Sequence, residues 1–400
     1  MKLIIHEFWM VMVMLGLSIS AYAYDFEVDG VFYTVTDLEK FEIEVANPFP
    51  NEPYTKTEIV IPSEIVYNGR TFVPVRIGER AFYYTKNLKS VSLPSSIKSI
   101  GKGAFQDSGL FTINLNDGLK IIEESAFEDC DNLNLTIPLS VETIETKAFF
   151  GCTSLRNKQI LKGFIGTDAF GGCSSLTDID LFGAIEISSY AFFGTSFKPD
   201  TLVISANTRV IGFKAVQDVQ HLIIADSQEE LHNKCEFPSL KSLYIGRNVG
   251  IKCERLLKKL VIGRQVTELA GGFYSESSMF ESAVSLDTLI IEDSEKHLEM
   301  GYRKYAKPGY GTNGVGLFTS CPLKDYVYIG RPLKVETDSE YGFSPFANVS
   351  YTRKHIKLLE FSNNVTNELG MNFFYGLSID YLICGENLSF SKYVFSNSGT

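Results

Sequence analysis

The chain has 400 residues, of which 44% are hydrophobic and 21% charged, and its formal net charge is −11 at pH 7. This acidic balance gives no electrostatic footprint for DNA or RNA and argues against a nucleic-acid partner. A chain of this length ordinarily divides into two or three domains, but internal repetition overrides that expectation here.

Residues 1–23 have the pattern of a secretory signal peptide. Lys2 provides a short charged start, Phe8 to Ile19 form an apolar run, and Ala21-Tyr22-Ala23 predicts cleavage after Ala23. The apolar run has about 12 residues, fewer than the roughly 18 to 20 that cross a bilayer. We therefore expect export, with the mature chain secreted or at the cell surface and without a membrane span.

Residues 24–55 are expected to form an N-terminal hairpin cap. The stretch DFEVDGVFYTVTD, residues 25–37, has two alternating segments around Asp29-Gly30, which is a strong hairpin signal. A repeat array needs a cap because its first coil would otherwise expose an apolar end.

Residues 56–400 repeat with a period near 22. Each of six phenylalanines follows an Ala and has an Ile five positions upstream: Phe82, Phe105, Phe127, Phe149, Phe170 and Phe192. A polar turn and an L-x-x-L-x-L triplet come next, with clear copies in LKSVSL (Leu88 to Leu93), LFTINL (Leu110 to Leu115) and LTDIDL (Leu176 to Leu181). The last two members of the triplet are two positions apart, which is the period of a strand with one buried face.

One such repeat cannot bury its apolar face alone, so stacked coils should share one continuous core. The predicted fold is a repeat solenoid, mainly β with short helical turns. Weaker triplets continue as far as IDYLIC, Ile379 to Cys384. They give about 14 coils, and at roughly 4.8 Å per stacked strand the array would be about 65 Å long.

The run LKSVSLPSSIKSIGKGAFQDSGLFTINL, residues 88–115, resembles the BspA-like class of leucine-rich repeats, found on secreted and surface proteins of Bacteroidetes and some parasitic protists. The resemblance implies a right-handed leucine-rich-repeat array with a parallel sheet on one face and short strands or single helical turns on the other. It also implies binding of host or matrix proteins or other surface ligands, and no catalytic motif or cofactor.

The later repeats are expected to carry insertions at about residues 263–285, 292–322 and 330–355. Insertions in solenoids form loops on one face, which is often the binding face. The second insertion holds a basic aromatic patch of Tyr302, Arg303, Tyr305 and Tyr310. Tyr and Arg commonly anchor interfaces, although a floppy surface loop is the alternative.

The position between the last two members of each triplet should face solvent. It is polar in early coils, where it is Ser92, Asn114, Thr136 and Asp180. In later coils it becomes apolar, as Val203, Ile223, Tyr244, Val261, Ile290 and Val327, before Glu360 interrupts and Ile383 resumes the pattern. This stripe predicts an interaction surface or a cover by another part of the chain. The alternative is that β-branched residues simply suit strands.

The sequence offers little for catalysis or metal binding. Gly309, Gly311 and Gly314 match G-x-G-x-x-G, but inside an insertion they predict a flexible loop, because a dinucleotide site needs a preceding strand and a following helix. No H-E-x-x-H or G-x-S-x-G motif occurs. Asp178 and Asp180 predict a solvated polar face rather than a Ca²⁺ site, since no EF-hand loop accompanies them. We expect no enzyme, no cofactor and no metal.

Seven cysteines occur in the chain, and three of them, Cys130, Cys152 and Cys173, share one repeat position. Stacking at about 5 Å does not forbid a disulfide. However, Ser108 and Thr195 fill the same position in sister coils. The position therefore predicts a slot for a buried small side chain.

The predicted function is binding of a protein partner, including adhesion to host or matrix proteins, by a non-enzymatic secreted or cell-surface protein. The candidate binding residues are Tyr302, Arg303, Tyr305, Tyr310, Tyr244, Ile223, Val261 and Ile290. The alternative is surface binding of a glycan or nutrient ligand, with Tyr302, Tyr305, Tyr310 and Tyr244 as stacking platforms.

Overall fold

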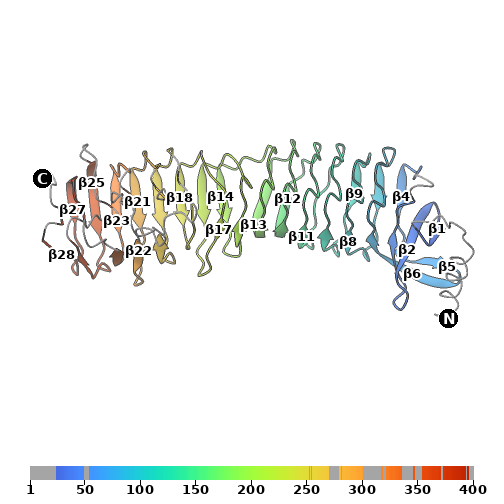
Figure 1. Ribbon diagram of the computed structural model, residues 1–400, viewed down its shortest axis with the longest axis horizontal. Coiled ribbons are helices and arrows are strands. Elements are labelled where there is room, and N and C mark those ends of the chain that lie inside the picture. Colours follow the sequence, from blue (N-terminus) through green and yellow to red (C-terminus); the bar gives the residue numbers. More distant parts are fainter. Residues whose placement is uncertain are drawn as a thin grey trace, which may run out of the picture.

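A computed structural model describes residues 24–48, 54–251, 253, 255–269, 279–280, 282–300, 317–318, 321–335, 346, 354–370, 373–392 and 394–395. These residues form one elongated stack of coils, with β1 at one end and β28 at the other (Figure 1). The expected signal peptide, residues 1–23, lies outside the described residues.

Two long sheets run along the stack. Twelve strands form the back sheet, in the order β1 (Phe26–Val28), β2 (Val31–Asp37), β3 (Glu42–Val45), β6 (Arg70–Ile77), β8 (Ser99–Ile100), β10 (Ile121–Ile122), β11 (Thr143–Ile144), β12 (Gln159–Ile165), β13 (Ile179–Ile187), β15 (Val210–Ile211) and β17 (His232–Asn233), with β5 (Ile65–Tyr67) paired to β6. Eight strands form the late sheet, in the order β14 (Thr201–Ile204), β16 (His221–Ile224), β18 (Ser242–Ile245), β19 (Lys259–Ile262), β21 (Thr288–Ile291), β23 (Tyr326–Ile329), β25 (Lys354–Phe361) and β27 (Leu377–Ile383).

Three smaller sheets complete the coils. They are β4 (Glu58–Val60) with β7 (Ser90–Ser92) and β9 (Thr112–Asn114); β20 (Glu268–Leu269) with β22 (Leu298–Met300) and β24 (Leu333–Val335); and β26 (Glu368–Leu369) with β28 (Ser389–Phe390). From β6 onward every pairing between coils is parallel, so each coil repeats the position of the one before it.

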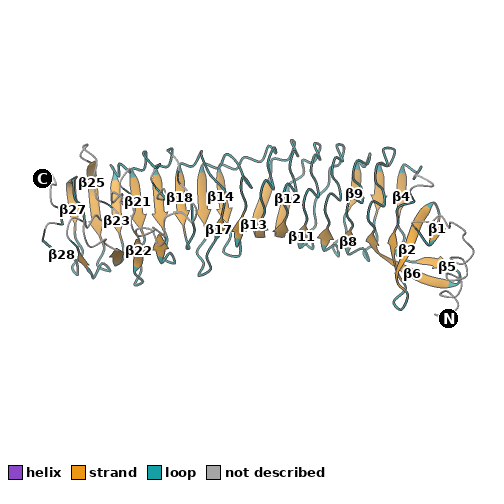
Figure 2. Ribbon diagram, viewed as in Figure 1, coloured by secondary structure: helices purple, strands orange, loops and turns teal. Residues whose placement is uncertain are grey.

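The described residues contain no helix, and hence none that could cross a membrane (Figure 2). The short helical turns expected at the coil corners are absent because each early corner has a left-handed residue two positions before and two after its phenylalanine. Around Phe82 these are Arg80 (φ 52°) and Tyr84 (φ 56°), and the pattern recurs as far as Tyr190 and Gly194. Left-handed residues interrupt a right-handed helix. The amides of Arg80, Phe82 and Tyr84 instead donate to carbonyls of the next coil over 2.9, 2.7 and 2.9 Å.

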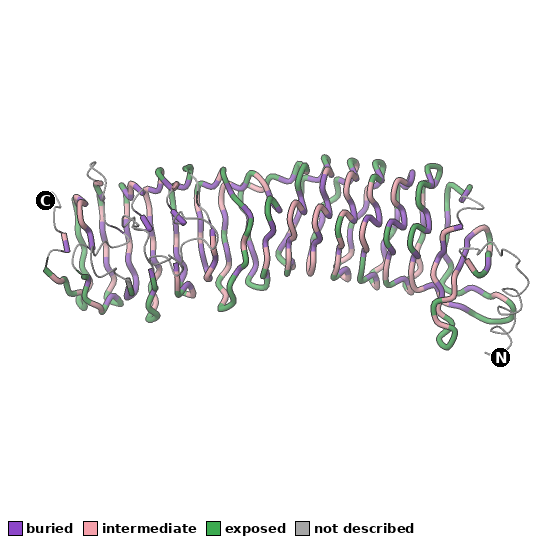
Figure 3. The backbone as a smooth tube through the Cα atoms, in the orientation of Figure 1, coloured by how far each residue is buried: buried purple, intermediate pink, exposed green. Residues whose placement is uncertain are grey.

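The corner phenylalanines form a ladder along the core. Rings from Phe82 to Phe192 are stacked with centroids 5.0, 5.2, 5.1, 5.2 and 5.4 Å apart. All six side chains are buried, and burial recurs once per coil along the stack (Figure 3). The stacked coils and continuous core predicted from the repeat are therefore confirmed.

A second ladder was not predicted. Phe280, Phe318 and Phe346 stack at 5.0 and 5.3 Å, although none of them follows an Ala. They lie in the ranges expected as insertions, together with β20, β22 and β24. Part of each range therefore belongs to the coils.

A hairpin and aromatic side chains cover the first coil. β1 and β2 form an antiparallel hairpin whose turn residues, Asp29 and Gly30, have φ values of 52° and 69°, as a tight hairpin turn requires. Tyr54 extends the ladder, because its ring lies 4.6 Å from Phe82 and 5.4 Å from Phe32. Its hydroxyl donates to the carbonyl of Ala46 over 3.0 Å.

One core position holds a polar side chain. Gln159 is fully buried. Residues 135–137 of the preceding coil are not paired as a strand with β9 or β12, and the side-chain amide of Gln159 bonds to their backbone instead. Its Oε1 accepts from the amide of Ile137 over 3.0 Å, and its Nε2 donates to the carbonyls of Leu135 and Asn157 over 2.9 Å each. A buried amide is tolerated when it is hydrogen-bonded in this way.

The shared cysteine position is confirmed as a slot for small buried residues. Cys130, Cys152 and Cys173 are buried free thiols. Their Sγ atoms donate to the carbonyls of Phe105, Phe127 and Phe149 in the preceding coils over 3.0, 3.1 and 3.0 Å. Burial raises the pKa of Cys130 to about 12.

The Phe127→Ala variant should lose about 3–5 kcal/mol of unfolding free energy, because it opens a cavity between two stacked rings. The matched control is Phe182→Ala, whose side chain is 71% exposed and whose loss should change stability by no more than about 0.5 kcal/mol. Equilibrium urea unfolding measures both. Equal losses would contradict the importance of the ladder.

Thiol reactivity tests the slot. Cys384 is exposed, whereas the other six cysteines are buried. A native sample treated with a thiol reagent at pH 8 should therefore show about one fast-reacting thiol, because a buried, protonated thiol is a poor nucleophile. The Cys384→Ser variant should show none, and denatured wild type should show all seven. Rapid reaction of several thiols in the native Cys384→Ser variant would contradict the structure.

Candidate binding face

The outer face of the late sheet brings one residue of each strand into a single line, which we call the central row. Parallel pairing sets its members directly beside one another in the order Val203, Ile223, Tyr244, Val261, Ile290, Tyr328, Glu360 and Ile383. Val203 and Ile223 are 43% and 39% exposed, and Tyr244, Val261 and Ile290 are half-buried. Four candidate residues, Ile223, Tyr244, Val261 and Ile290, are thus adjacent on one surface.

The prediction that Val327 belongs to this outward row is wrong. Val327 is fully buried, and Tyr328 occupies the row instead. The strand is offset by one residue from the sequence triplet, and this register buries Val327 and Ile329. The opposite register would place Tyr326 and Tyr328 in the core, where their hydroxyls would need partners.

The other candidates, Tyr302, Arg303, Tyr305 and Tyr310, lie outside the described residues, as does the glycine motif at Gly309 to Gly314.

Tyr244 is held in a fixed orientation. Its hydroxyl donates to Asp226 Oδ1 over 2.8 Å, and Glu292 Oε2 lies 3.4 Å away as a second acceptor. The side chain extends over Gly263 of the next coil, where an added Cβ would come within 2.6 Å of the hydroxyl. Burial and the hydrogen bond to Asp226 raise the pKa of Tyr244.

The carboxyl ends of the strands form an acidic edge made of Asp226, Glu292 and Asp293. Tyr328 donates to Asp293 Oδ2 over 2.8 Å, and Asn364 Nδ2 donates to Asp293 Oδ1 over 3.0 Å. Burial and the bond to Asp293 raise the pKa of Tyr328 to about 12. Tyrosine hydroxyls therefore connect the central row to this edge.

The amino ends of β18 and β19 form a lysine edge made of Lys241, Lys258 and Lys259, all exposed. Lys259 lies between Ser242 and Thr288 on the neighbouring strands. The outer face is thus apolar along its middle, positive on one flank at β18 and β19, and negative on the other. Asp200, Asp287 and Asp325 lie on the same flank as the lysines, just before β14, β21 and β23. Sequence reasoning missed both edges because their residues are spread over several coils.

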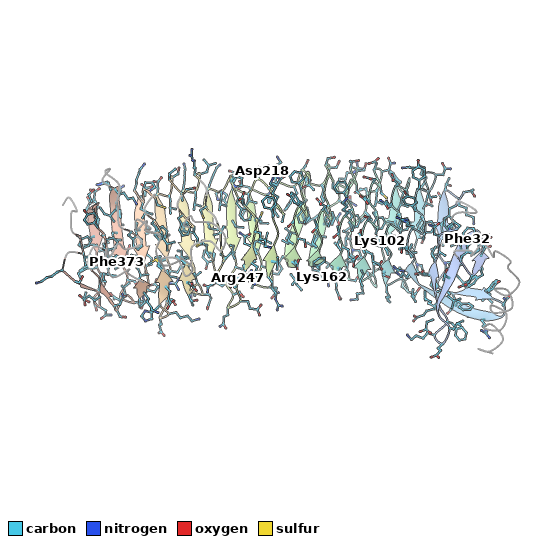
Figure 4. The ribbon with its side chains drawn as sticks, viewed as in Figure 1. Phe32, Lys102, Lys162, Asp218, Arg247 and Phe373 are labelled. Atoms are coloured by element: carbon cyan, nitrogen blue, oxygen red, sulfur yellow. The ribbon has the colours of Figure 1, made fainter. Side chains whose placement is uncertain are left out.

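Two buried arginines fix the coils beneath this face. Arg247, which is labelled in Figure 4, donates to the carbonyls of Ala206 and Ser205 over 2.9 and 2.8 Å. Arg331 donates to those of Val266 and Gly263 over 2.7 and 2.8 Å. Each side chain thus passes the preceding coil and bonds to the coil before that. Burial lowers the pKa of Arg331 to about 10. In the sequence, both arginines end the same tetrapeptide, Tyr-Ile-Gly-Arg, at 244–247 and 328–331, and this repetition was the signal of their shared role.

The described residues contain no group of three or more His, Cys, Asp or Glu side chains placed to hold a metal ion. His355 contacts Ser378 Oγ through Nδ1 and Asp380 Oδ2 through Nε2, each at 3.0 Å. His355 and Asp380 are exposed and Ser378 is half-buried, and the three lie on the neighbouring paired strands β25 and β27. We interpret the trio as a cross-strand pairing of polar side chains.

Comparisons with known proteins agree with the repeat pattern. A family model described as BspA type leucine rich repeat region matches in six copies, over residues 75–198 and 158–279. No curated protein sequence matches. Similar solved structures include a leucine rich cell surface protein from Faecalibacterium prausnitzii, with 18% identity, a TM-score of 0.44, and coverage of 96% of this chain and 100% of that one. A leucine-rich repeat protein from Bacteroides ovatus has 18% identity, a TM-score of 0.38, and coverage of 92% and 90%.

Raised tyrosine pKa values predict a loss of stability at high pH. The pKa of Tyr328 is about 12 in the folded chain, whereas an unfolded tyrosine ionises near 10. The stabilising contribution is therefore complete below pH 10 and is lost as pH rises toward 12. Urea unfolding between pH 9 and 12 should show this decline, with a shallower slope in Tyr328→Phe. Equal slopes would contradict the hydrogen bond to Asp293.

Proposed function

Because the chain belongs to the BspA-type leucine-rich-repeat family, we propose that it is a non-enzymatic surface or secreted protein that binds a protein partner through the outer face of its late sheet. Leucine-rich repeats are a scaffold commonly used for binding proteins, and a solenoid offers an extended surface on a rigid core. The pattern of a signal peptide in residues 1–23 supports export.

The observation that carries the proposal is the change of character along one face. In early coils most outward residues, such as Ser92, Asn114 and Thr136, are polar and exposed. The exposed apolar residues Val60 and Ile160 stand singly there, beside polar residues of the paired strands. From Val203 to Tyr328 the same position is apolar or aromatic. At about 4.8 Å per strand, this part of the row is roughly 24 Å long, which allows many modest contacts to add up.

A protein partner fits this face better than a glycan does. Tyr244, an expected stacking platform, lies with its ring end against Gly263 of the next coil, and its hydroxyl is already held by Asp226. The aliphatic members, such as Val261 and Ile290, suit an apolar protein surface. Adhesion to host or matrix proteins is the corresponding biological role.

Binding can be measured with the mature chain, from residue 24, against panels of matrix proteins and polysaccharides. Ile290→Asp should weaken protein binding tenfold or more, because it places a charge in the middle of an apolar contact. Asn114→Asp is the matched control, since Asn114 has the equivalent outward place on β9 and is exposed. Thermal unfolding should confirm that both variants are folded.

Three results would overturn adhesion to a foreign protein through this face: no binding to either panel, polysaccharide binding alone, or undiminished protein binding by folded Ile290→Asp. Deletion of residues 301–316 tests separately whether the expected Tyr302 to Tyr310 patch contributes.

A further inference from the structure

We propose that the protein bound by this face is a second copy of the chain, docked face to face with the two solenoids parallel. The inference rests on the proposed function, because it names the partner of the same surface. It follows from the arrangement of charge on either side of the central row.

The two charged edges flank the central row at equal distances. Lys259 precedes Val261 by two residues on β19, and Glu292 follows Ile290 by two residues just beyond β21. Two residues of strand span about 6.8 Å, so each edge lies about that far from the row along the strand direction. The row is therefore close to a line of antisymmetry, with positive charge on one side and negative charge on the other.

The opposite charges also lie beside the same coils. The hydroxyl of Tyr244 approaches both Asp226 and Glu292, which places these carboxylates beside the carboxyl ends of β18 and β19. The three lysines stand at the amino ends of these two strands. Arg264 Nε, 3.9 Å from Glu292, offsets part of the negative charge. Asp200, Asp287 and Asp325, which directly precede β14, β21 and β23, confine the positive charge of the lysine edge to β18 and β19.

A twofold axis lying along the central row makes this face complementary to itself. Rotation about the axis turns the second copy over and sets its lysine edge against the acidic edge of the first, twice in each dimer. A twofold axis parallel to the strands would instead oppose lysine to lysine and carboxylate to carboxylate, which is repulsive. Charge therefore selects the parallel arrangement, and a twofold pair is the commonest form of self-association.

The size of the face sets the expected strength. Glu360 would meet its own counterpart on this axis, so the contact is confined to β14 through β23. About 24 Å of row by roughly 20 Å of width gives about 500 Å² per copy, or about 1,000 Å² in total. This is at the lower limit of specific interfaces, so we expect a reversible dimer with a dissociation constant in the micromolar range or weaker.

A charge exchange tests the pairing. Lys259→Glu opposes Glu to Glu292 in both halves of the dimer, and Glu292→Lys opposes Lys to Lys259. Each variant alone should dimerise at least tenfold more weakly than wild type in sedimentation velocity from about 1 to 200 μM. An equimolar mixture should associate again, because both contacts between the two variants are then Glu with Lys. A loss of folding would not be restored by mixing.

Cross-linking tests the position of the axis. Val261→Cys, made in a Cys384→Ser background, should be joined to its counterpart by a short bis-maleimide. A residue on the axis faces its own counterpart across two sheets about 10 Å apart, which is too far for a direct disulfide. Asn114→Cys in the same background is the control and should remain monomeric. Wild type that sediments as a monomer throughout the range, a mixture no stronger than its parts, or equal cross-linking of both cysteine variants would overturn the dimer.

The panel measurements described above separate this inference from the broader proposal. If the wild-type chain stays monomeric and its panel binding is lost in Ile290→Asp, the binding face is retained and the second copy is rejected as its partner. Self-association with the expected charge-exchange behaviour, but without panel binding, would support the second copy and reject the foreign partner.

Discussion

The structure depends on one constraint: each coil must lie in register on the one before it. The constraint is strongest at the corner, where stacked phenylalanine rings lie 5.0 to 5.4 Å apart between Phe82 and Phe192 and backbone amides donate straight across to the next coil. A residue type that works in one coil then works in its neighbours, which is why Ile, Ala, Phe and the small-residue slot recur. Surface residues are free of this requirement, yet registration still aligns them. A row such as Ile223, Tyr244, Val261 and Ile290 is therefore a by-product of core packing that a few outward substitutions can turn into a binding face.

The late coils combine a more adaptable surface with a more unusual interior. Beneath the central row, Arg247 and Arg331 bring guanidinium groups into the core with backbone carbonyls as acceptors. Buried charge is tolerated only with such hydrogen bonds. Above them, tyrosine hydroxyls tie the row to carboxylates at the strand ends. The outer side chains are thus held in place from both directions, and such preorganisation lowers the entropy lost on binding.

The sequence was sufficient for the repeat solenoid and for the outward positions of the early coils, because the apolar period determines them. It was insufficient wherever polar contacts decide. Tyr328 replaces Val327 in the row because two strand registers satisfy the same apolar pattern. The tyrosine hydroxyls favour the register in which they face outward. Gln159 and Arg331 violate the expected pattern of a core, and each is understood only through acceptors in other coils. The lysine and acidic edges emerge only when four coils are superposed, since no single repeat contains both.

The long-range hydrogen bonds of the two buried arginines change how the array should unfold. A solenoid held by contacts between adjacent repeats alone can fray one repeat at a time. Arg247 and Arg331 each bond to the coil two before their own, so the coil in between is bypassed by a direct link. Their bonds add a second-neighbour coupling to the late half of the stack. Under a pulling force, that half should yield in blocks of three coils, whereas a region coupled only to its immediate neighbours would yield coil by coil.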